Sequence, residues 1–210
     1  MFTAAQARSW VSSTASEIED QAAALTKLDS AIGDGDHGSN MNRGFKAAVQ
    51  RLDGLEDEDF AGIFKAVGMA LIGKIGGASG PLYGSLFLGM AKELGDGTEV
   101  EDERLAAALR AGYDSVVARG KAQLEDKTML DAWHPALEAL DAALAGGKEL
   151  GPALDEAAAA AEAGMKATIP MVARKGRASY LGERSRDHQD PGATSTHLIL
   201  KTLADVVNGR

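Results

Sequence analysis

Apolar residues recur along most of this chain at the three- to four-residue spacing that is typical of amphipathic helices. The first apolar stripe, with one polar member, consists of Val11, Thr14, Ile18, Ala22 and Leu25. The pattern predicts about eight helices, at approximately residues 4–27, 38–52, 58–72, 79–94, 101–117, 128–146, 152–166 and 190–207. Most connections are short, so neighbouring helices should be antiparallel. No Pro- or Ser-rich linker divides the chain, and we predict a single all-α domain over residues 1–210.

Residues suited to helix capping precede three of these helices. Thr3 can cap the first helix, and Asp190-Pro191 is a favourable start for the last. At the sixth helix, Thr128 and Asp131 have the spacing of an acidic variant of the capping box.

Alternate connections of an up-and-down bundle lie at the same end. One end should therefore carry the connections at residues 28–38, 73–79, 118–128 and 168–190, and the other those at 53–57, 95–100 and 146–151. The first set holds nearly all the unusual residues, and each of its members leads into a helix N-terminus. The last of them, residues 168–190, has no clear period. Helix counting thus predicts a single rim on which any functional groups gather.

Composition narrows the possible partners. The chain has a net charge of −9, which argues against nucleic acid or an anionic membrane as the partner of the whole surface. It has no cysteine, so disulfides and thiol chemistry are excluded. The N-terminus lacks the pattern of a signal peptide, and no apolar run approaches the ~20 residues of a membrane span. We expect a cytoplasmic protein that must concentrate positive charge locally if it binds phosphate.

Three aspartates within eight residues, Asp29, Asp34 and Asp36, are the most informative feature. Carboxylates this close repel one another unless a cation neutralises them, and hard oxygen ligands suit Mg²⁺ or Ca²⁺. The alternative is a solvated acidic turn in which Asp36 caps the next helix. An EF-hand does not fit, since the required glycine pattern and the twelfth-position glutamate are missing. A metal cluster beside a helix N-terminus is suited to holding phosphate. The residues that follow at this helix start are His37, Gly38, Ser39 and Asn40.

A glycine-rich stretch at residues 76–84, which includes Ala78 and Ser79, precedes the fourth helix. Glycines there allow backbone N–H groups to approach a ligand closely. The lysine and hydroxyl ending of a Walker motif is absent. The competing interpretation is a tight helix–helix corner with a serine cap.

Residues 174–194 combine length with positive charge. Five basic residues lie in this segment of a net-acidic protein: Arg174, Lys175, Arg177, Arg184 and Arg186. Loops of this length are usually functional or disordered, and this one could supply the charge that phosphate binding demands. A flexible solvated loop is the alternative.

Other residues favour structural roles. Trp10 and Trp133 are expected in the core, while His134 and His197 carry no usable pattern. His188 fits a surface position better than a catalytic base. In the motif at residues 126–133, Met129 is suited either to packing on a flat ring or to the core.

Five motifs together carry a resemblance to a known family: residues 33–44, 76–81, 119–121, 126–129 and 173–184. They closely resemble the DhaL family, the nucleotide-binding subunits of bacterial dihydroxyacetone kinases, in order and over essentially the full chain. The resemblance implies an antiparallel barrel of eight helices with ADP or ATP held at one rim.

The resemblance also implies roles for individual residues. Asp29, Asp34 and Asp36 would bind two Mg²⁺ ions that hold the phosphates. Nucleotide contacts would come from His37, Gly38, Ser39, Asn40, Ala78, Ser79, Gly120, Met129, Arg177, Asp190, Pro191 and Gly192. We take Arg177, together with the three aspartates, as the catalytic group, because a guanidinium stabilises charge on a transferring phosphoryl group.

The resemblance further implies partners. The acceptor sugar, dihydroxyacetone, would sit on a separate DhaK-type subunit. In one variant of the family ADP stays bound as a coenzyme and is rephosphorylated by a DhaM-type protein of the phosphoenolpyruvate phosphotransferase system. In the other, ATP is the substrate, the module is usually fused behind a DhaK-type module, and cysteine usually replaces His37. The chain stands alone and has His37, and both features favour the coenzyme type. We also expect a homodimer.

Several alternatives stay open from the sequence. Free-standing subunits also serve kinases of other short keto sugars. The nucleotide-binding domain of fatty acid kinase is a more distant relative, which usually has threonine at the His37 position and lacks the Arg/Gly loop. Outside the kinases, a non-catalytic nucleotide-binding regulatory protein and a Ca²⁺-stabilised structural bundle are the rival interpretations.

Overall fold

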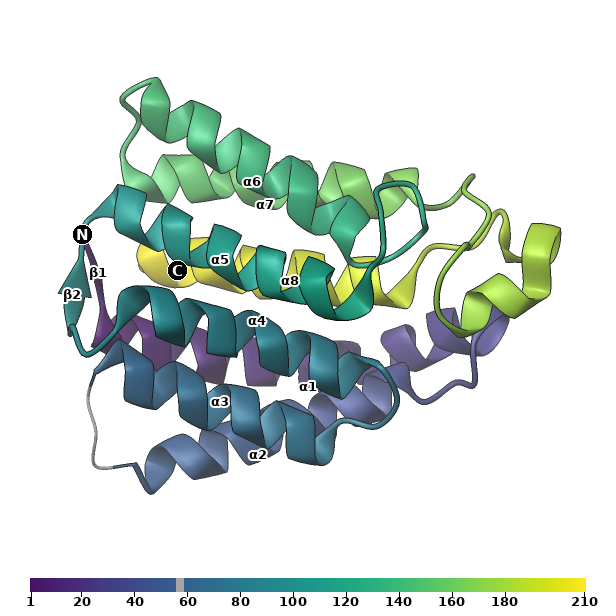
Figure 1. Cartoon of the computed structure of the whole chain (residues 1–210), viewed down its shortest axis with the longest axis horizontal. Helices are drawn as coiled ribbons and strands as arrows, with labels where there is room; N and C mark the ends of the chain where they lie inside the picture. Colours follow the sequence, from purple (N-terminus) through teal and green to yellow (C-terminus); the bar gives the residue numbers. More distant parts are fainter. Residues whose placement is uncertain (56–58) are drawn as a thin grey trace.

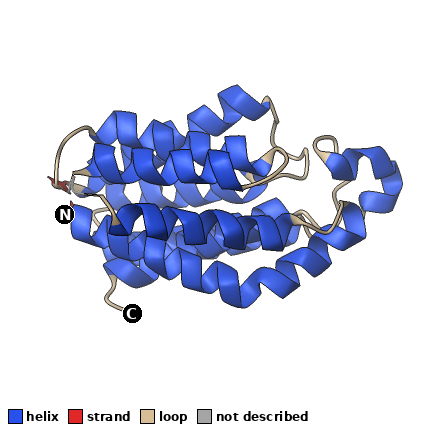
Figure 2. Cartoon of the chain, turned by 90° about the horizontal axis from the view of Figure 1, so that it is seen from below, coloured by secondary structure: helices blue, strands red, loops and turns tan. Residues whose placement is uncertain are grey.

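Eight α-helices lie side by side along the long axis of the molecule in a computed structural model that describes residues 1–55 and 59–210 (Figure 1). Their bounds are Ala4–Ile32 (α1), His37–Asp53 (α2), Phe60–Lys74 (α3), Ser79–Leu94 (α4), Asp102–Gly120 (α5), Leu130–Ala145 (α6), Leu150–Ala167 (α7) and Pro191–Val207 (α8). A 3₁₀ helix, η1, spans Arg177–Ser185, and two short strands are β1 (Phe2–Thr3) and β2 (Glu99–Val100). Viewed from below, the molecule is helical almost throughout, with its loops at the two ends (Figure 2).

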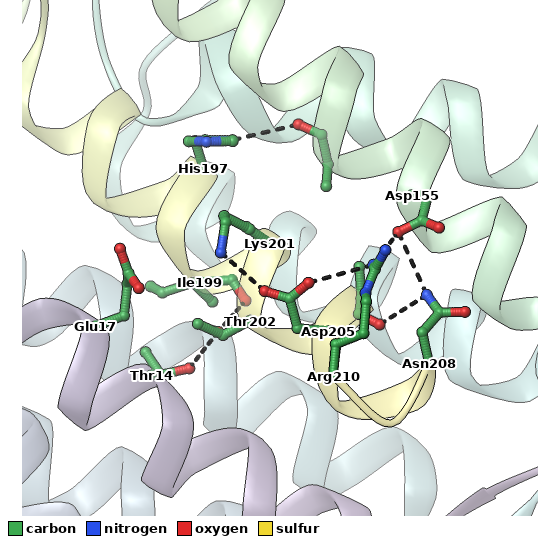
Figure 3. Close-up of polar contacts among 12 residues, drawn as sticks. Thr14, Glu17, Asp155, His197, Ile199, Lys201, Thr202, Asp205, Asn208 and Arg210 are labelled. Atoms are coloured by element: carbon green, nitrogen blue, oxygen red, sulfur yellow. Dashed lines mark hydrogen bonds and ion pairs between the residues drawn. The ribbon is translucent and has the colours of Figure 1, made fainter.

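The helices close into a ring. Each one packs on the next in sequence, and α1 completes the ring by packing on α8. Two buried hydrogen bonds join this last pair, one between the hydroxyls of Thr14 and Thr202 at 2.7 Å and one from Trp10 Nε1 to the Ile199 carbonyl at 2.9 Å. Thr14, polar within an apolar stripe, is thereby satisfied by a partner on the facing helix (Figure 3). The antiparallel barrel of eight helices expected from the sequence is confirmed.

Most helix bounds lie within two residues of the predicted ones, and the larger corrections are at α1 and α5. The first helix does not end near Lys27 but continues to Ile32, so Asp29 lies in its last buried turn and not in a loop. Aspartate and serine only weakly oppose a helix, and the first strong breaker after Lys27 is Gly33. Helix α5 continues to Gly120, three residues beyond its expected end, so Arg119 and Gly120 lie on the helix and not in the connection that follows it. The sixth helix begins at Leu130, two residues later than expected. The expected start of the third helix, residue 58, lies outside the described residues.

Capping bonds explain several of these helix starts. Thr3 and Gln6 form a reciprocal capping box at α1, as the threonine there predicted. Before α6, the Asp131 carboxylate accepts the N–H of Thr128 at 2.7 Å, and the Thr128 hydroxyl accepts the N–H of Leu130 at 3.2 Å. Only one half of the expected capping box forms, because the Asp131 N–H donates to the Thr128 carbonyl and not to its hydroxyl, and the N-cap of α6 is Met129. The pair therefore orders the turn before the helix.

Among the described residues, a hydrophobic core runs through the barrel and includes a group of aromatic side chains from α1, α3 and α4. Trp10, Phe64 and Phe87 meet there with ring centroids 5.6–6.0 Å apart. Trp10 and Trp133 are both fully buried, which confirms their expected place in the core. Aromatic packing of this kind anchors the helices to one another.

Contacts between segments that are far apart in the sequence also close the end that carries the termini. Strands β1 and β2 form an antiparallel pair in which Phe2 is opposite Val100, an element that helical periodicity alone did not reveal. Arg210 forms ion pairs with Asp155 on α7 and Asp205 on α8 (Figure 3). Such surface pairs each contribute roughly 0–1 kcal/mol. Among the described residues, no helix combines the length and the apolar composition needed to cross a bilayer.

Candidate functional site

Four connections meet at the end of the barrel opposite the termini, as helix counting predicted. They surround a pocket of about 510 Å³. Most of the expected site residues line it: Asp29, Asp34, Asp36, His37, Ala78, Ser79, Gly120, Met129, Arg177, Asp190, Pro191 and Gly192. Residues more than 150 positions apart in the sequence are thus brought to one cavity by the up-and-down topology.

The three aspartates converge in this pocket. Oxygen atoms of Asp29, Asp34 and Asp36 lie within 4.8 Å of one another. Asp29 is buried, and its Oδ2 accepts the backbone N–H groups of Asp36 at 2.8 Å and His37 at 3.0 Å. These bonds fold the 33–36 turn back on the end of α1 and aim the three carboxylates at one point.

Two glycines allow this arrangement. Gly35, between Asp34 and Asp36, has a φ of +73°, which a glycine adopts without steric cost. Gly33 leaves room for a carboxylate, because a Cβ there would lie 2.0 Å from Asp29 Oδ1. A set of three carboxylates with one oxygen kept clear by a glycine fits a hard divalent cation such as Mg²⁺.

A buried hydrogen-bond network supports the adjoining wall. His37 Nε2 is 2.9 Å from the Ser195 hydroxyl, which is 2.6 Å from the Tyr83 hydroxyl. Tyr83 also donates to the Gly192 carbonyl at 3.1 Å, and Ser79 Oγ lies 3.5 Å from His37 Nδ1. The network links α2, α4 and α8 behind the pocket.

Burial sets the charge state of this wall. Burial lowers the pKa of His37, although the charges of Asp29 and Asp36 oppose the shift. Burial also raises the pKa of Tyr83 to about 12, partly offset by its hydrogen bond to Ser195. Both side chains are therefore neutral hydrogen-bonding groups near pH 7.

Helix N-termini supply donors for an anion. The N-cap residues of α2, α4 and α6, which are Asp36, Ala78 and Met129, make no side-chain capping bond. The start of α2 is only partly open, because the His37 N–H already donates to Asp29, and in α6 the Leu130 N–H already donates to the Thr128 hydroxyl. The helix dipoles favour negative charge at these N-termini. The fourth N-terminus differs, because Asp190 caps α8 by accepting the N–H of Ala193 at 2.7 Å.

Three of the expected site residues lie beside the pocket and do not line it. Gly38 packs tightly on α1, where a Cβ would lie 2.0 Å from the Ala22 carbonyl. Ser39 Oγ donates to the Asp36 carbonyl at 2.9 Å, and the buried side chain of Asn40 accepts from Arg43. Their roles as nucleotide contacts stay predictions.

The basic segment is ordered over the pocket. We call residues 174–186 the cap segment; they contain η1 and lie beside the last turns of α1 at the right of Figure 1. Arg177 Nε is 3.0 Å from Asp34 Oδ2. The segment is thus partly helical, although most of its side chains are exposed, and it places one guanidinium at the carboxylate cluster. His188 is exposed, as expected for a surface histidine.

Sequence reasoning did not assign roles to Tyr83, Ser195 or Lys127. Tyr83 lay within the glycine-rich motif and Lys127 within the motif before α6, but neither spacing revealed a partner. Ser195 carries no local pattern, since its partners come from helices more than 100 residues away. Long-range packing alone brings these groups together.

A helical barrel with a carboxylate cluster, open helix N-termini and a basic cap at one rim has the features of a metal-dependent phosphate-binding protein. A family model described as the DAK2 domain matches residues 31–205, and the chain belongs to this family.

Relatives and a solved structure agree with this assignment. The chain is 47% identical over 180 residues to the "PEP-dependent dihydroxyacetone kinase, ADP-binding subunit DhaL" of Escherichia coli, covering 86% of each chain. It is 41% identical over 198 residues to the "PTS-dependent dihydroxyacetone kinase, ADP-binding subunit DhaL" of Lactococcus lactis, covering 94% of this chain and 95% of the relative. The dihydroxyacetone kinase from C. freundii, solved in complex with AMP-PNP and Mg²⁺, matches with a TM-score of 0.73 and 29% identity. That match covers 96% of this chain but only 34% of the solved chain.

Proposed function

We propose that this chain is the nucleotide-binding subunit of a dihydroxyacetone kinase. It holds Mg²⁺ with ADP or ATP and transfers the terminal phosphoryl group to dihydroxyacetone on a separate DhaK-type subunit. The observation that carries the proposal is the convergence of Asp29, Asp34 and Asp36 beside open helix N-termini. It occurs in a chain 47% identical to a subunit named as ADP-binding.

Different residues of the pocket bind the metal and the phosphates. Asp29, Asp34 and Asp36 hold the metal, and we propose that two ions bind there. Mg²⁺ neutralises phosphate charge when it is bound. The open N-termini of α2 and α4 donate N–H groups to phosphate oxygens.

Other residues position the nucleotide. His37, neutral and fixed by Ser195, presents Nδ1 toward Ser79 at the pocket wall. Met129 and Gly120 also line the pocket and are suited to a flat base. Arg177 reaches the carboxylate cluster from the cap segment and is placed to stabilise negative charge on a transferring phosphoryl group.

We further propose that ADP is kept as a coenzyme and rephosphorylated by a DhaM-type donor. The two relatives reported above are named as PEP-dependent and PTS-dependent, and the chain covers 86% and 95% of their lengths. His37 is present, as in the coenzyme type. An ATP-dependent subunit for dihydroxyacetone or another short keto sugar is the second candidate. A homodimer and a cytoplasmic location stay predictions from the sequence.

Two measurements test the proposal. Chromatography of the denatured purified protein should release about one ADP per chain, whereas an empty pocket with weak, exchangeable ATP binding would favour the second candidate. Adding a DhaK-type subunit and a phosphorylated DhaM-type donor should give phosphate transfer to dihydroxyacetone. Nucleotide binding without transfer under any donor would instead support a regulatory binding protein.

A further inference from the structure

Lys127 is a buried cation whose side chain is only 1% exposed. Its ammonium group donates to the carbonyls of Thr168 at 2.7 Å, Met171 at 3.1 Å and Ile169 at 3.3 Å, and also to the carbonyl of His188. All four acceptors belong to the two stretches that flank the cap segment, residues 168–173 and 187–190, which we call its limbs. The ammonium has three hydrogens, so these carbonyls occupy its full donor capacity.

Apart from Lys127, the limbs are joined by one other charged donor, the exposed guanidinium of Arg186, which donates to the Pro170 carbonyl at 3.0 Å, and by neutral bonds. The N–H of Asp187 donates to the Ile169 carbonyl at 2.8 Å, and the N–H of Ala173 donates to Ser185 Oγ at 2.8 Å. Lys127 comes from a third segment, the connection between α5 and α6, and adds a charged donor to both limbs at once. Charge-assisted hydrogen bonds of this kind are roughly twice as strong as neutral ones.

The surroundings keep the cation in place. Thr168 is the C-cap of α7, so Lys127 faces the negative end of that helix dipole. Burial lowers the pKa of Lys127, and the charges of Asp190 and Asp187 oppose that shift. Its backbone has a φ of +62°, an uncommon conformation for lysine that the neighbouring bond from the Arg174 N–H to the Asp126 carbonyl helps to hold.

Lys127 also borders the pocket, so a direct contact with phosphate is the competing role. The geometry favours an indirect one, because the ammonium points at four backbone carbonyls. Lys127 joins the two limbs, and the cap segment between them contains Arg177, which pairs with the Asp34 carboxylate. We propose that Lys127 is a positioning residue that fixes the base of the cap segment and thereby places Arg177 over the pocket. The link to turnover rests on the proposed kinase function.

The first test needs no activity. Hydrogen exchange of the full chain is compared for wild type, Lys127→Met and the control Lys166→Met. Lys166 lies at the same end of α7 but is exposed and pairs with Glu162. Lys127→Met should raise exchange in residues 168–190 by about 10-fold or more, with little change in α2 to α4. The control should match wild type, and unchanged exchange at 168–190 in Lys127→Met would overturn the proposal.

The second test separates positioning from direct contact. Turnover with a DhaK-type partner is measured for Lys127→Met, Arg177→Ala and the double variant. If Lys127 acts through Arg177, the double variant should lie within about 3-fold of the slower single variant, since the losses are then not additive. Losses that multiply would assign Lys127 a direct contact and overturn the proposal.

Failure of the Lys127 proposal can be told apart from failure of the proposed kinase function. If wild type shows no transfer, the kinase proposal fails, while hydrogen exchange still decides whether Lys127 fixes the cap segment. If Lys127→Met does not fold, Lys127→Gln, which keeps a shorter donor, takes its place in both tests. Failure of both variants to fold would overturn the proposal, because Lys127 would then support the whole barrel and not the cap segment.

Discussion

Arg177 and Asp34 form an ion pair, with Nε and Oδ2 3.0 Å apart, that joins the cap segment to the carboxylate cluster. The two residues are 143 positions apart in the sequence, and both side chains are partly exposed. An exposed pair of this kind contributes little to stability. Under the proposed function its role is different: a metal ion bound at the cluster would compete with Arg177 for Asp34 and leave the guanidinium free to contact phosphate.

Replacing Asp34 tests this relationship. Asp34→Asn keeps the side-chain shape but removes the charge that pairs with Arg177 and that would hold the proposed metal. Mg²⁺-dependent ADP affinity, measured by titration calorimetry, should fall by roughly 100-fold, while the melting temperature stays close to that of wild type. Asp96→Asn, in a turn at the opposite end of the barrel, is the matched control. Wild-type affinity in Asp34→Asn would remove the metal from the proposed site.

A substitution at Gly33 tests the proposed metal site without removing any carboxylate. In Gly33→Ala the new methyl group would lie 2.0 Å from Asp29 Oδ1 and must displace that carboxylate. We expect Mg²⁺-dependent ADP binding to weaken about 10-fold or more, since metal ligands tolerate little displacement. Gly73→Ala is the control, because a Cβ there meets nothing within 4 Å. Equal binding by the two variants would show that the position of Asp29 does not matter.

Tyr83 should stabilise the pocket wall through its hydroxyl. Tyr83→Phe removes the bonds to Ser195 and to the Gly192 carbonyl and leaves a partly buried carbonyl without this donor. We expect a loss of about 1–2 kcal/mol in the free energy of unfolding, measured by urea denaturation, together with faster ADP release. Tyr180→Phe, at a side chain that is 87% exposed, should change neither quantity. Stability loss without faster release would confine Tyr83 to a structural role.

The helices and the rim could be predicted from the sequence because both depend on local information, whereas the closed barrel was implied by the family resemblance. Helical period and helix count place the four connections at one end, and the start of α4 at Ser79 follows from its glycine-rich approach. The sequence did not predict that Asp29 lies on a helix, since the carboxylate is held by N–H groups seven and eight residues later. Nor did it predict the partners of Lys127, which depend on how the two limbs of the cap segment pack around a residue far from them in the sequence.

Asp190 should make the stability of the protein depend on pH. Burial raises the pKa of its carboxyl group to about 7, although the N–H of Ala193 opposes the shift. The unfolded chain ionises near the ordinary value of 3.8, so between about pH 4 and 7 the folded state binds the extra proton. The stability contributed by the protonated form is therefore fully present below pH 4 and is lost as the pH rises through 7.

Asp190→Asn isolates this effect, because asparagine also caps helices well. The free energy of unfolding of wild type, minus that of Asp190→Asn, should decrease from pH 5 to 7 and level off above about pH 8. Its slope cannot exceed about 1.4 kcal/mol per pH unit for one proton. Asp59→Asn, at the cap of α3 on the other end of the barrel, reports the effect of an amide cap alone. A difference that stays constant from pH 5 to 8 would show that Asp190 is already ionised in the folded protein throughout this range.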